Sequence, residues 1–581
     1  MMHVCYIHVF SFGVLRNIGL SFDHRYEFDM ANECLRISKN THTIPDNFWG
    51  RGIYSLTAIV GNNGCGKTTA LRLMKRLLIE GAPRNEDAEV LIVYELQGCL
   101  MVYKPEAIRV ETATPDIQVN EIHERRHIDT LYYSGHFQPY TGEDDMELAG
   151  SYEASDGWQL VHDLQDYANI DSMHLSEPLY NHLSAYYAQN NYRICEVLSI
   201  EGLRDLLHSV RLPRYVMFTP NRGGWNAIKL DRMGRYDELD IPNERPTCVD
   251  AREQALERLV YYDVLNLIVE GKGDQHELCE FLREWIAAPK DNGVVVSLEH
   301  RMIVGENASE AQKALASLHF VIQRIDELCE FDENSRTFYV DVAEDANILR
   351  TLITRMIRSN YFLTSRFFDI IYSHNLIETS RLSSGEQELL NLLSRLYYGI
   401  TIKPQKFHNI SSPRILLLDE AEIGFHPDWQ RQYVKMLTEF MSYMRVRAGV
   451  DFQIIITSHS PIILSDVPVS CVNFLRREGD VTELVNNEQE TFGENVFRLY
   501  RRAFFMKNGL VGEFVKTKIQ ALEEAIEAGE VTETIRKQVE MIGDERIREY
   551  LMRRMGEHNV DAEIAYYEAK IRELRNRRRE D

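Results

Sequence analysis

The sequence of 581 residues has few of the features that mark secreted, membrane-spanning or fibrous proteins. Its nine cysteines form no C-x-x-C pair and their number is odd, which is typical of reduced thiols in the cytosol. No apolar run approaches the about 18 residues that a transmembrane helix needs. Residues 1–13 lack a basic segment followed by an apolar one, and the chain has neither an internal repeat nor a Pro-rich or Gly/Ser-rich linker. We therefore expect a cytoplasmic globular protein without a signal peptide or a membrane span.

Basic residues are also fewer than acidic residues. The chain has 65 basic and 89 acidic residues, so its formal net charge is −24. Overall charge therefore does not attract it to DNA or to an anionic membrane. Basic clusters occur at Arg125–Arg126, Arg501–Arg502, Arg553–Arg554 and Arg575–Arg579. We interpret each cluster as a solvated face, because DNA binding would need several of them on one surface.

The clearest motif is the glycine-rich string at 61–68, which reads G-N-N-G-C-G-K-T and matches G-x-x-x-x-G-K-[ST]. It follows an expected strand at 56–60 and opens an expected helix at 68–79. Small residues let backbone N–H groups converge on phosphate, and the helix N-terminus adds positive potential. The string predicts an ATP site, with Lys67 on the β- and γ-phosphates and the Thr68 hydroxyl on Mg²⁺. The residues expected around the nucleotide phosphates are Asn62, Gly64, Cys65, Gly66, Lys67, Thr68 and Thr69.

Two acidic residues follow a second apolar run, R-I-L-L-L-D-E at 414–420. Asp419 and Glu420 would stand at the carboxyl end of a buried strand, where open α/β sheets bind their ligands. Asp419 fits the ligand shell of Mg²⁺, and Glu420 fits the base that polarises the attacking water. Acids after a strand are also common as helix caps. Together with a P-loop they predict ATP hydrolysis.

Two further strings have a structural and a functional interpretation. Residues 382–387 read L-S-S-G-E-Q ahead of an expected helix at 388–398. They form either an ordinary N-cap or an anion-binding helix N-terminus. His459 follows the run I-I-I-T-S at 454–458. An imidazole past a buried strand can hydrogen-bond phosphate or water, or it can serve the structure alone.

All four strings, in this order, resemble the ABC ATPase superfamily over residues 1–140 and 380–480. The string at 382–387 is similar to its signature motif, 419–420 to its Walker B acids and His459 to its switch histidine. The resemblance implies two heads around ATP, as a homodimer or a higher homo-oligomer. It also implies the remaining roles: γ-phosphate contact in trans for Ser384, Gly385 and Glu386, catalysis for Ser384, Glu420 and His459, and Mg²⁺ ligation for Thr68, Asp419 and Gln138.

The subfamily can be narrowed. Lys67 and Ser384 are 384 − 67 = 317 residues apart, which resembles the split heads of the SMC, RecF and RecN group. The string D-E-A-E-I-G-F-H-P at 419–427 is similar to the D-E-P-E-x-x-L-H-P of bacterial defence ATPases, with Ala421 and Phe425 as departures. Residues 491–495, 504–514 and 542–548 are similar to ATPase subunits of Septu-type and retron-associated anti-phage systems. That resemblance implies a separate HNH-type nuclease as partner, and leaves contact with DNA or with retron RNA/DNA open.

Three functions compete at this point. The first is an ATP-driven switch that controls a partner nuclease in anti-phage defence. The second is a RecF- or RecN-like ATPase that processes DNA without an effector. The third is a nuclease of the overcoming-lysogenization-defect type, but no D-x-D follows His459. A literal H-E-x-x-H at His123–His127 lies between β-like flanks, unlike a zincin helix, so we interpret it as a polar turn. We predict the first function, an ATPase that is not itself a nuclease.

These patterns predict an α/β fold, namely an ABC-type P-loop ATPase head assembled from the N- and C-terminal parts of the chain. Residues 1–140 would form the first part and 376–512 the second. Residues 141–375 would form a mostly helical insertion, and 513–581 a helical C-terminal region. The expected strands are 4–10, 14–22, 35–37, 55–60, 89–96, 100–103, 130–134, 414–418 and 452–457. Helices are expected at 252–269 and 311–328, among others.

Overall fold

The protein, seen here as a computed structural model, divides into two units, residues 1–499 and 500–581. The structure describes residues 2–41, 43–78, 89–136, 151–155, 179–207, 211–220, 247–270, 274–299, 308–358, 368–377, 382–402, 414–479, 481–485, 490–502, 512–558, 564, 567–568 and 571–572. The predicted mixed α/β class is confirmed by a large, partly parallel sheet with helices.

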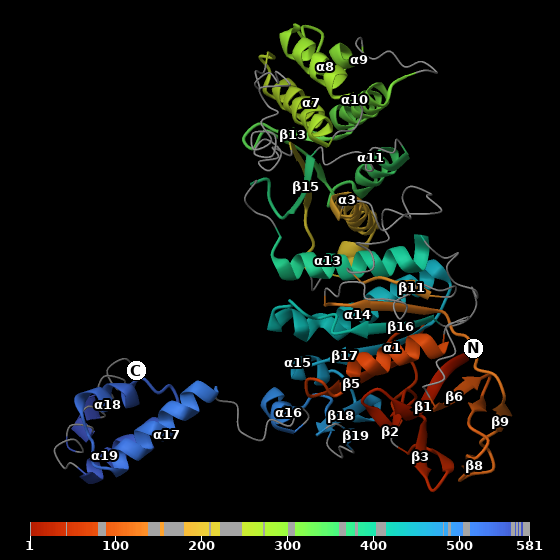
Figure 1. The fold of residues 1–581 in the computed structure, drawn as a ribbon, viewed down its shortest axis with the longest axis vertical. Helices are drawn as coiled ribbons and strands as arrows, with labels where there is room; N and C mark the ends of the chain where they lie inside the picture. The colour runs from red at the N-terminus through yellow and green to blue at the C-terminus, as the bar shows by residue number, and fades with distance from the viewer. Residues whose placement is uncertain are drawn as a thin grey trace. The chain divides into compact units, whose positions relative to one another are not determined.

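A twelve-stranded sheet forms the centre of the first unit (Figure 1). Its strand order is β11-β10-β16-β17-β5-β18-β19-β2-β1-β6-β7-β9. Strands from the two ends of the chain therefore share one sheet. Their bounds are β1 Met2–Phe12, β2 Leu15–Ser21, β5 Ile53–Gly61, β6 Glu89–Leu96, β7 Cys99–Tyr103, β9 Val119–Ile122, β10 Thr130–Ser134, β11 Ser151–Glu153, β16 Arg414–Asp419, β17 Phe452–Ser458, β18 Val472–Glu478 and β19 Val481–Leu484.

The strand that precedes the glycine-rich loop, β5, lies between β17 and β18 and pairs with both in parallel. β16 also pairs in parallel with β17 on one side and β10 on the other. These strands are rich in Ile, Leu and Val because both of their faces are buried. Since parallel strands end at the same edge of a sheet, the residues that follow β5, β10, β16 and β17 meet there.

Helices cover both faces of this parallel part. Leu71 and Met74 of α1 (Lys67–Leu78) share a core cluster with Ile59, Ile415 and Ile455. The strand residues between these positions face the other way and are buried as well. Two long helices, α13 and α14, run beside the strands in Figure 1. The bounds of this group are α13 Ser384–Tyr397, the π-helix η2 Tyr398–Ile402, α14 Pro427–Ala448, α15 Pro461–Leu464, the 3-10 helix η4 Val469–Cys471 and α16 Val496–Arg502.

A second, three-stranded sheet packs over the N-terminal strands. It has the order β3-β4-β8, with bounds Tyr26–Ala31, Cys34–Lys39 and Arg109–Thr112. Leu35 and Ile37 of β4 lie in a buried cluster with Cys5, Leu91 and Val93. The sequence predicted only the middle strand of this sheet. β3 and β8 have mostly exposed or half-buried side chains, so they lack the apolar runs on which the prediction relied.

The middle of the chain is not helical alone. Its described helices are α3 Leu179–Leu198, α4 Leu203–Leu206, α7 Ala251–Glu270, α8 Gln275–Ala287, α9 Val294–Glu299, α10 Glu310–Leu328 and α11 Ala346–Arg358. They accompany an antiparallel sheet of order β13-β14-β12-β15, which the sequence did not predict. Its bounds are β12 Tyr215–Pro220, β13 Glu330–Asp332, β14 Thr337–Asp341 and β15 Phe368–Ser373. β13 and β14 form a short hairpin across residues 333–336, but β12 and β15 come from distant segments, so the sequence has no local signal for the complete sheet.

Helix α13 is fixed to the middle region by a buried arginine. Arg395 has no exposed surface. Its guanidinium donates to the backbone oxygen of Ala154, to the Tyr186 hydroxyl and to Asn190 Oδ1, at 3.0, 3.0 and 3.3 Å. Tyr186 and Asn190 belong to α3. The helix that starts at Ser384 is therefore tied to α3 through a buried polar network.

The second unit is helical. α17 (Glu513–Glu527), α18 (Glu533–Glu540) and α19 (Glu545–His558) surround a small core that includes Leu522, Val539 and Leu551. Within the described ranges, no helix of the protein is both long enough and apolar enough to cross a membrane.

Two buried amide side chains join strands from opposite ends of the chain. Gln453 of β17 accepts a hydrogen bond from the backbone N–H of Val4 at 3.1 Å and donates to the Val4 oxygen at 2.8 Å. Asn473 of β18 pairs in the same way with the backbone of Ser21, at 3.0 and 2.8 Å. Each amide thus satisfies the backbone N–H and C=O of one strand residue, Val4 or Ser21.

We expect Gln453→Leu to lower the free energy of unfolding by about 2–4 kcal/mol, because it leaves two buried backbone groups of Val4 without a partner. Thermal unfolding of the purified protein, followed by intrinsic fluorescence, measures the change. Gln520→Leu, at an exposed position of α17, serves as the control and should change little. Equal stability of the Gln453→Leu variant and the parent would contradict this assignment.

Candidate active site

The loop after β5 can accept only small residues at three positions. A side chain at Gly61 would meet the Leu475 backbone oxygen at 2.0 Å, so β18 comes too close for a Cβ atom. Gly64 and Gly66 have φ values of +73° and +90°, which L-residues rarely adopt. α1 begins directly afterwards at Lys67. A tight loop of glycines before a helix N-terminus is the geometry that binds phosphate through backbone N–H groups.

Lys67 turns back into this loop. Its side chain is 4% exposed. Its Nζ lies 3.4 Å from the backbone oxygens of Gly61 and Asn62, 2.6 Å from His459 Nε2 and 3.7 Å from Glu420 Oε1. The residues predicted to bind phosphate and to activate water therefore lie around one ammonium group.

Asp419 is fully buried at the end of β16. The Thr457 hydroxyl donates to its Oδ1 at 2.5 Å, and the Tyr132 hydroxyl donates to its Oδ2 at 3.1 Å. The register of β10, β16 and β17 places Ser134 and Thr457 on either side of Asp419. Each carboxylate oxygen keeps a further lone pair, so Asp419 can still bind a divalent cation. Thr68 is the second residue of α1, and its role with Asp419 as a Mg²⁺ ligand stays a prediction.

Glu420 is held in an unusual backbone conformation beyond the strand. Its φ is +48°, and its N–H donates to Thr457 Oγ1 at 3.0 Å. Its carboxylate lies 2.8 Å from His136 Nε2 and 3.0 Å from His459 Nε2. Burial alone would raise the pKa of this carboxyl, but the contacts with the two histidines and with Lys67 outweigh burial and lower the pKa from 4.5 to about 2. Glu420 is therefore ionised at neutral pH, as a group that accepts a proton must be.

His459 cannot satisfy both neighbours at once. The same nitrogen, Nε2, lies 2.6 Å from the Lys67 ammonium and 3.0 Å from the Glu420 carboxylate. It accepts a hydrogen bond from Lys67 only when it carries no proton, and it donates to Glu420 only when it does. The proton on Nε2 therefore decides which of the two neighbours His459 hydrogen-bonds.

The sequence missed His136, and the prediction for the neighbouring Gln138 lies outside the described residues. Gly135 makes the position of His136 possible, because a Cβ there would meet the Glu420 backbone oxygen at 2.3 Å. The string that follows β10 contains both His136 and Gln138, but only Gln138 was predicted to be a site residue. The contact between His136 and Glu420 depends on the register of β10 against β16, and the sequence does not reveal that register.

Two further residues near the site were also missed. Glu422 is buried and accepts a hydrogen bond from the Ser458 hydroxyl, and burial raises its pKa to about 7. Arg477 of β18 donates to the Gly64 oxygen at 3.2 Å, at the glycine-rich loop itself.

The H-E-x-x-H residues, 123–127, lie in an irregular segment between β9 and β10, as the interpretation as a polar turn predicts.

The signature-like string begins α13 as a capping box. Ser383 is the N-cap: its hydroxyl accepts from the Glu386 N–H at 3.3 Å, while the Glu386 carboxylate accepts from the Ser383 N–H at 2.7 Å. Glu386 also lies 2.8 Å from His374 Nε2, so its carboxylate serves the helix within this chain. A Cβ at Gly385 would meet the Gly424 oxygen at 3.0 Å. Ser384 is exposed, and its hydroxyl is accessible at the first turn of the helix.

Comparison with known proteins supports the ATPase interpretation. A family model described as "AAA domain, putative AbiEii toxin, Type IV TA system" matches residues 321–465, which include Ser384, Asp419, Glu420 and His459. Relatives named as ATPases include the "Retron Vc95 probable ATPase" of Vibrio cholerae serotype O1 biovar El Tor, 25% identical over 127 residues (22% of this chain and 23% of the relative). Another is the "Retron Ec83 probable ATPase" of Escherichia coli, 28% identical over 106 residues (18% of each chain).

"Protein ea59" of Escherichia phage lambda is 30% identical over 144 residues, which is 25% of this chain and 24% of the relative. The matched stretches span about a quarter or less of these relatives' own lengths. Together with the loop and strand geometry, the matches indicate that the protein carries a nucleotide-binding ATPase domain of the P-loop kind.

The site geometry predicts different failures for Lys67→Ala and Glu420→Gln. Lys67→Ala should weaken ATP binding about 10- to 150-fold, because phosphate loses a charged hydrogen-bond donor. Glu420→Gln should bind ATP but lose turnover about 10²- to 10⁴-fold, because an amide cannot take a proton from water. Nucleotide titration and phosphate release measure the two effects separately. Unchanged hydrolysis by Glu420→Gln would show that another group is the base.

Proposed function

We propose that this protein is the ATP-hydrolysing switch subunit of a bacterial anti-phage defence complex. The observation that carries the proposal is the convergence of Lys67, Glu420 and His459 at the ends of three parallel strands. The names of two relatives as retron ATPases support the defence context. So does the likeness of residues 419–427 to defence ATPases.

In the proposed reaction, ATP is the substrate and the glycine loop binds its phosphates. Mg²⁺, held by Thr68 and Asp419, would neutralise phosphate charge. When ATP binds, the Lys67 ammonium leaves the loop oxygens and His459 Nε2 and contacts phosphate oxygens instead. His459 Nε2 is then available to donate to Glu420 or to a phosphate oxygen. Glu420 accepts a proton from the water whose oxygen attacks the γ-phosphorus, and ADP leaves with the electron pair of the broken P–O bond.

The proposal includes two heads that share their sites. Ser383 and Ser384 are exposed at the start of α13, so another molecule can reach this helix N-terminus. The positive end of a helix favours an anion, and a γ-phosphate held by the P-loop of a second subunit is such an anion. In this arrangement, Ser384 and Gly385 act in trans, and hydrolysis requires a dimer or a higher homo-oligomer.

Ser384→Arg should leave ATP binding intact but reduce hydrolysis to background, because a long side chain blocks the helix N-terminus. Mixing this variant with Lys67→Ala should restore part of the activity. One of the two composite sites then joins an intact P-loop to an intact signature helix. Phosphate release measures the recovery, and mixed dimers carrying two different affinity tags confirm that subunits have exchanged. No recovery in confirmed mixed dimers would count against action in trans.

The proposed output of the switch is control of a separate nuclease. The most promising docking regions are the middle of the chain and the helical unit after residue 500, because neither supplies a P-loop site residue. ATP binding can move an effector equilibrium only by the difference in affinity between the open and closed heads. A difference of about 3 kcal/mol already changes an equilibrium more than a hundredfold.

The functional test is to purify this protein alone and together with the nuclease encoded beside its gene. Alone, it should hydrolyse ATP and leave DNA and RNA uncut in Mg²⁺ or Mn²⁺. The complex should be stable, and Glu420→Gln should change its cutting, because that variant holds ATP without turnover. Cleavage by the protein alone that is lost on mutation of its own acids would overturn the proposal. Stimulation by DNA ends without any effector would favour the RecF- or RecN-like alternative.

A further inference from the structure

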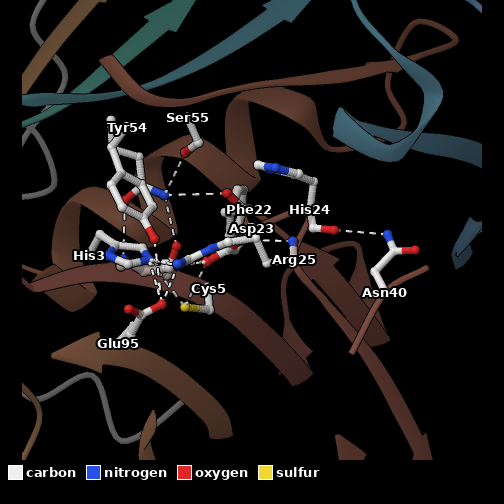
Figure 2. A network of polar contacts seen from close by, with 12 residues as sticks. His3, Cys5, Phe22, Asp23, His24, Arg25, Asn40, Tyr54, Ser55 and Glu95 are labelled. Carbon is white, nitrogen blue, oxygen red and sulfur yellow. Dashed lines mark hydrogen bonds and ion pairs between the residues drawn. The ribbon is translucent and has the colours of Figure 1, made fainter. Parts of the chain in front are cut away.

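Four side chains with metal-binding atoms meet inside the first unit, away from the P-loop. They are His3, Cys5, Asp23 and Glu95, and one ligand atom from each lies within 4.8 Å of all the others. Figure 2 shows these side chains pointing toward one another, with Arg25 and Tyr54 beside them. All four residues are buried, with less than a tenth of their surface exposed.

Neighbouring strands bring the four together. His3 and Cys5 lie two residues apart on β1, and Glu95 of β6 is paired directly opposite His3. Asp23 follows β2, which pairs with the other side of β1. The backbone also fixes this corner, because the Phe22 N–H donates to the Cys5 oxygen at 2.8 Å. The ligand atoms are therefore carried by three adjacent strand segments rather than by loose surface loops.

Four of the six separations between these atoms are close to those of a zinc site, and the other two are within 4.8 Å. Tetrahedral zinc bound to nitrogen, sulfur and oxygen at ordinary bond lengths places its ligand atoms roughly 3.3–3.6 Å apart. Here His3 Nε2 lies 3.1 Å from Asp23 Oδ2, 3.5 Å from Cys5 Sγ and 3.7 Å from Glu95 Oε2. Cys5 Sγ lies 3.5 Å from Asp23 Oδ2.

The charges of the cluster also favour a divalent cation. Arg25 is the cation now present: its Nη2 lies 2.6 Å from Asp23 Oδ2 and also contacts Glu95 Oε2. With a neutral imidazole and a neutral thiol, two carboxylates and one guanidinium have a formal net charge of −1 in this cluster. Zn²⁺ together with a Cys5 thiolate would bring the sum to zero. Arg25 Nη2 also lies 3.3 Å from His3 Nε2, so one guanidinium nitrogen now contacts three of the four candidate ligand atoms.

A zinc ion would occupy the space that Arg25 Nη2 now fills. The Arg25 side chain is 36% exposed, so its end can move outward. Its Nε already donates to the outer oxygen of Asp23, Oδ1, at 3.0 Å, and this contact can remain. The Tyr54 hydroxyl lies 3.5 Å from Glu95 Oε2, and the Tyr54 ring packs on His3 with 3.7 Å between ring centres. Such outer contacts orient metal ligands.

We propose that His3 Nε2, Cys5 Sγ, Asp23 Oδ2 and Glu95 Oε2 bind one Zn²⁺ as a structural site. The thiol gives its proton to solvent on binding, and Arg25 moves to the outer oxygens of the two carboxylates. Four protein ligands leave no open position for a substrate, which is typical of a structural rather than a catalytic zinc. The ion would join β1, β2 and β6, and this role is independent of ATP hydrolysis.

The test uses the full-length protein without a metal-binding tag, purified with and without added Zn²⁺ and then desalted. Elemental analysis should find one zinc per chain. Replacement by Co²⁺ should give the absorption of a thiolate–cobalt bond, a readout that needs no variant. Asp419→Asn should keep the metal, which excludes the P-loop region as its location.

Cys5→Ser and Asp23→Asn should each lower the zinc content at least tenfold, whereas Cys34→Ser, at another buried cysteine of the same unit, should not. Arg25→Ala removes the guanidinium that now pairs with Asp23 and Glu95. This variant should still bind zinc, because the metal then holds the two carboxylates together. The proposal is overturned if the folded parent protein contains less than a tenth of a zinc per chain after incubation with the metal and gives no thiolate–cobalt band. It is equally overturned if Cys5→Ser and Cys34→Ser retain the same amount.

Discussion

The parallel pairing of β5 with β17 and β18 is the constraint on which the rest of the structure depends. It brings residues 53–61 into register with residues about 400 positions later in the chain, and every site residue takes its place from that register. Lys67 follows β5, Asp419 and Glu420 end β16, and His459 follows β17. A shift of β5 by one residue would turn its buried side chains to the other face and separate Lys67 from Glu420.

At the common edge of these strands, one anion is surrounded by three cations or potential cations. Glu420 is ionised because His136, His459 and Lys67 lie around it, although half-burial opposes its charge. In the proposed reaction, these contacts hold the Glu420 carboxylate before nucleotide binds. Phosphate would compete with Glu420 for Lys67, so substrate binding would change the environment of the proposed base. A positive φ at Glu420 and the absence of a side chain at Gly135 are what allow this crowded arrangement.

The sequence was most informative where chemistry depends on consecutive residues. The glycine loop, the acids after an apolar run and the helix start at 383–386 each occupy a short string, and the structure places them where those strings end or begin elements. The sequence did not predict site residues whose positions depend on the register between neighbouring strands. His136 and Arg477 reach the site from neighbouring strands. Glu422 lies inside the string at 419–427, but its hydrogen bond with Ser458 depends on the pairing of β16 with β17. The same holds for the sheet β13-β14-β12-β15, whose strands come from segments up to about 150 residues apart.

The buried hydrogen bonds of Arg395 make the two ends of α13 different. Its first turn presents Ser384, while its last turns are bound to α3 in the middle region. Breaking that anchor would leave a buried guanidinium unpaired, so separating α13 from α3 is energetically costly. If ATP favours one position of α13, as the proposed switch requires, thermodynamic reciprocity applies. A molecule that binds the middle region more tightly in that position would then raise the affinity for ATP, and ATP would raise the affinity for that molecule by the same factor. Binding of a trigger molecule to the middle region would then be measurable as a change in the affinity for ATP.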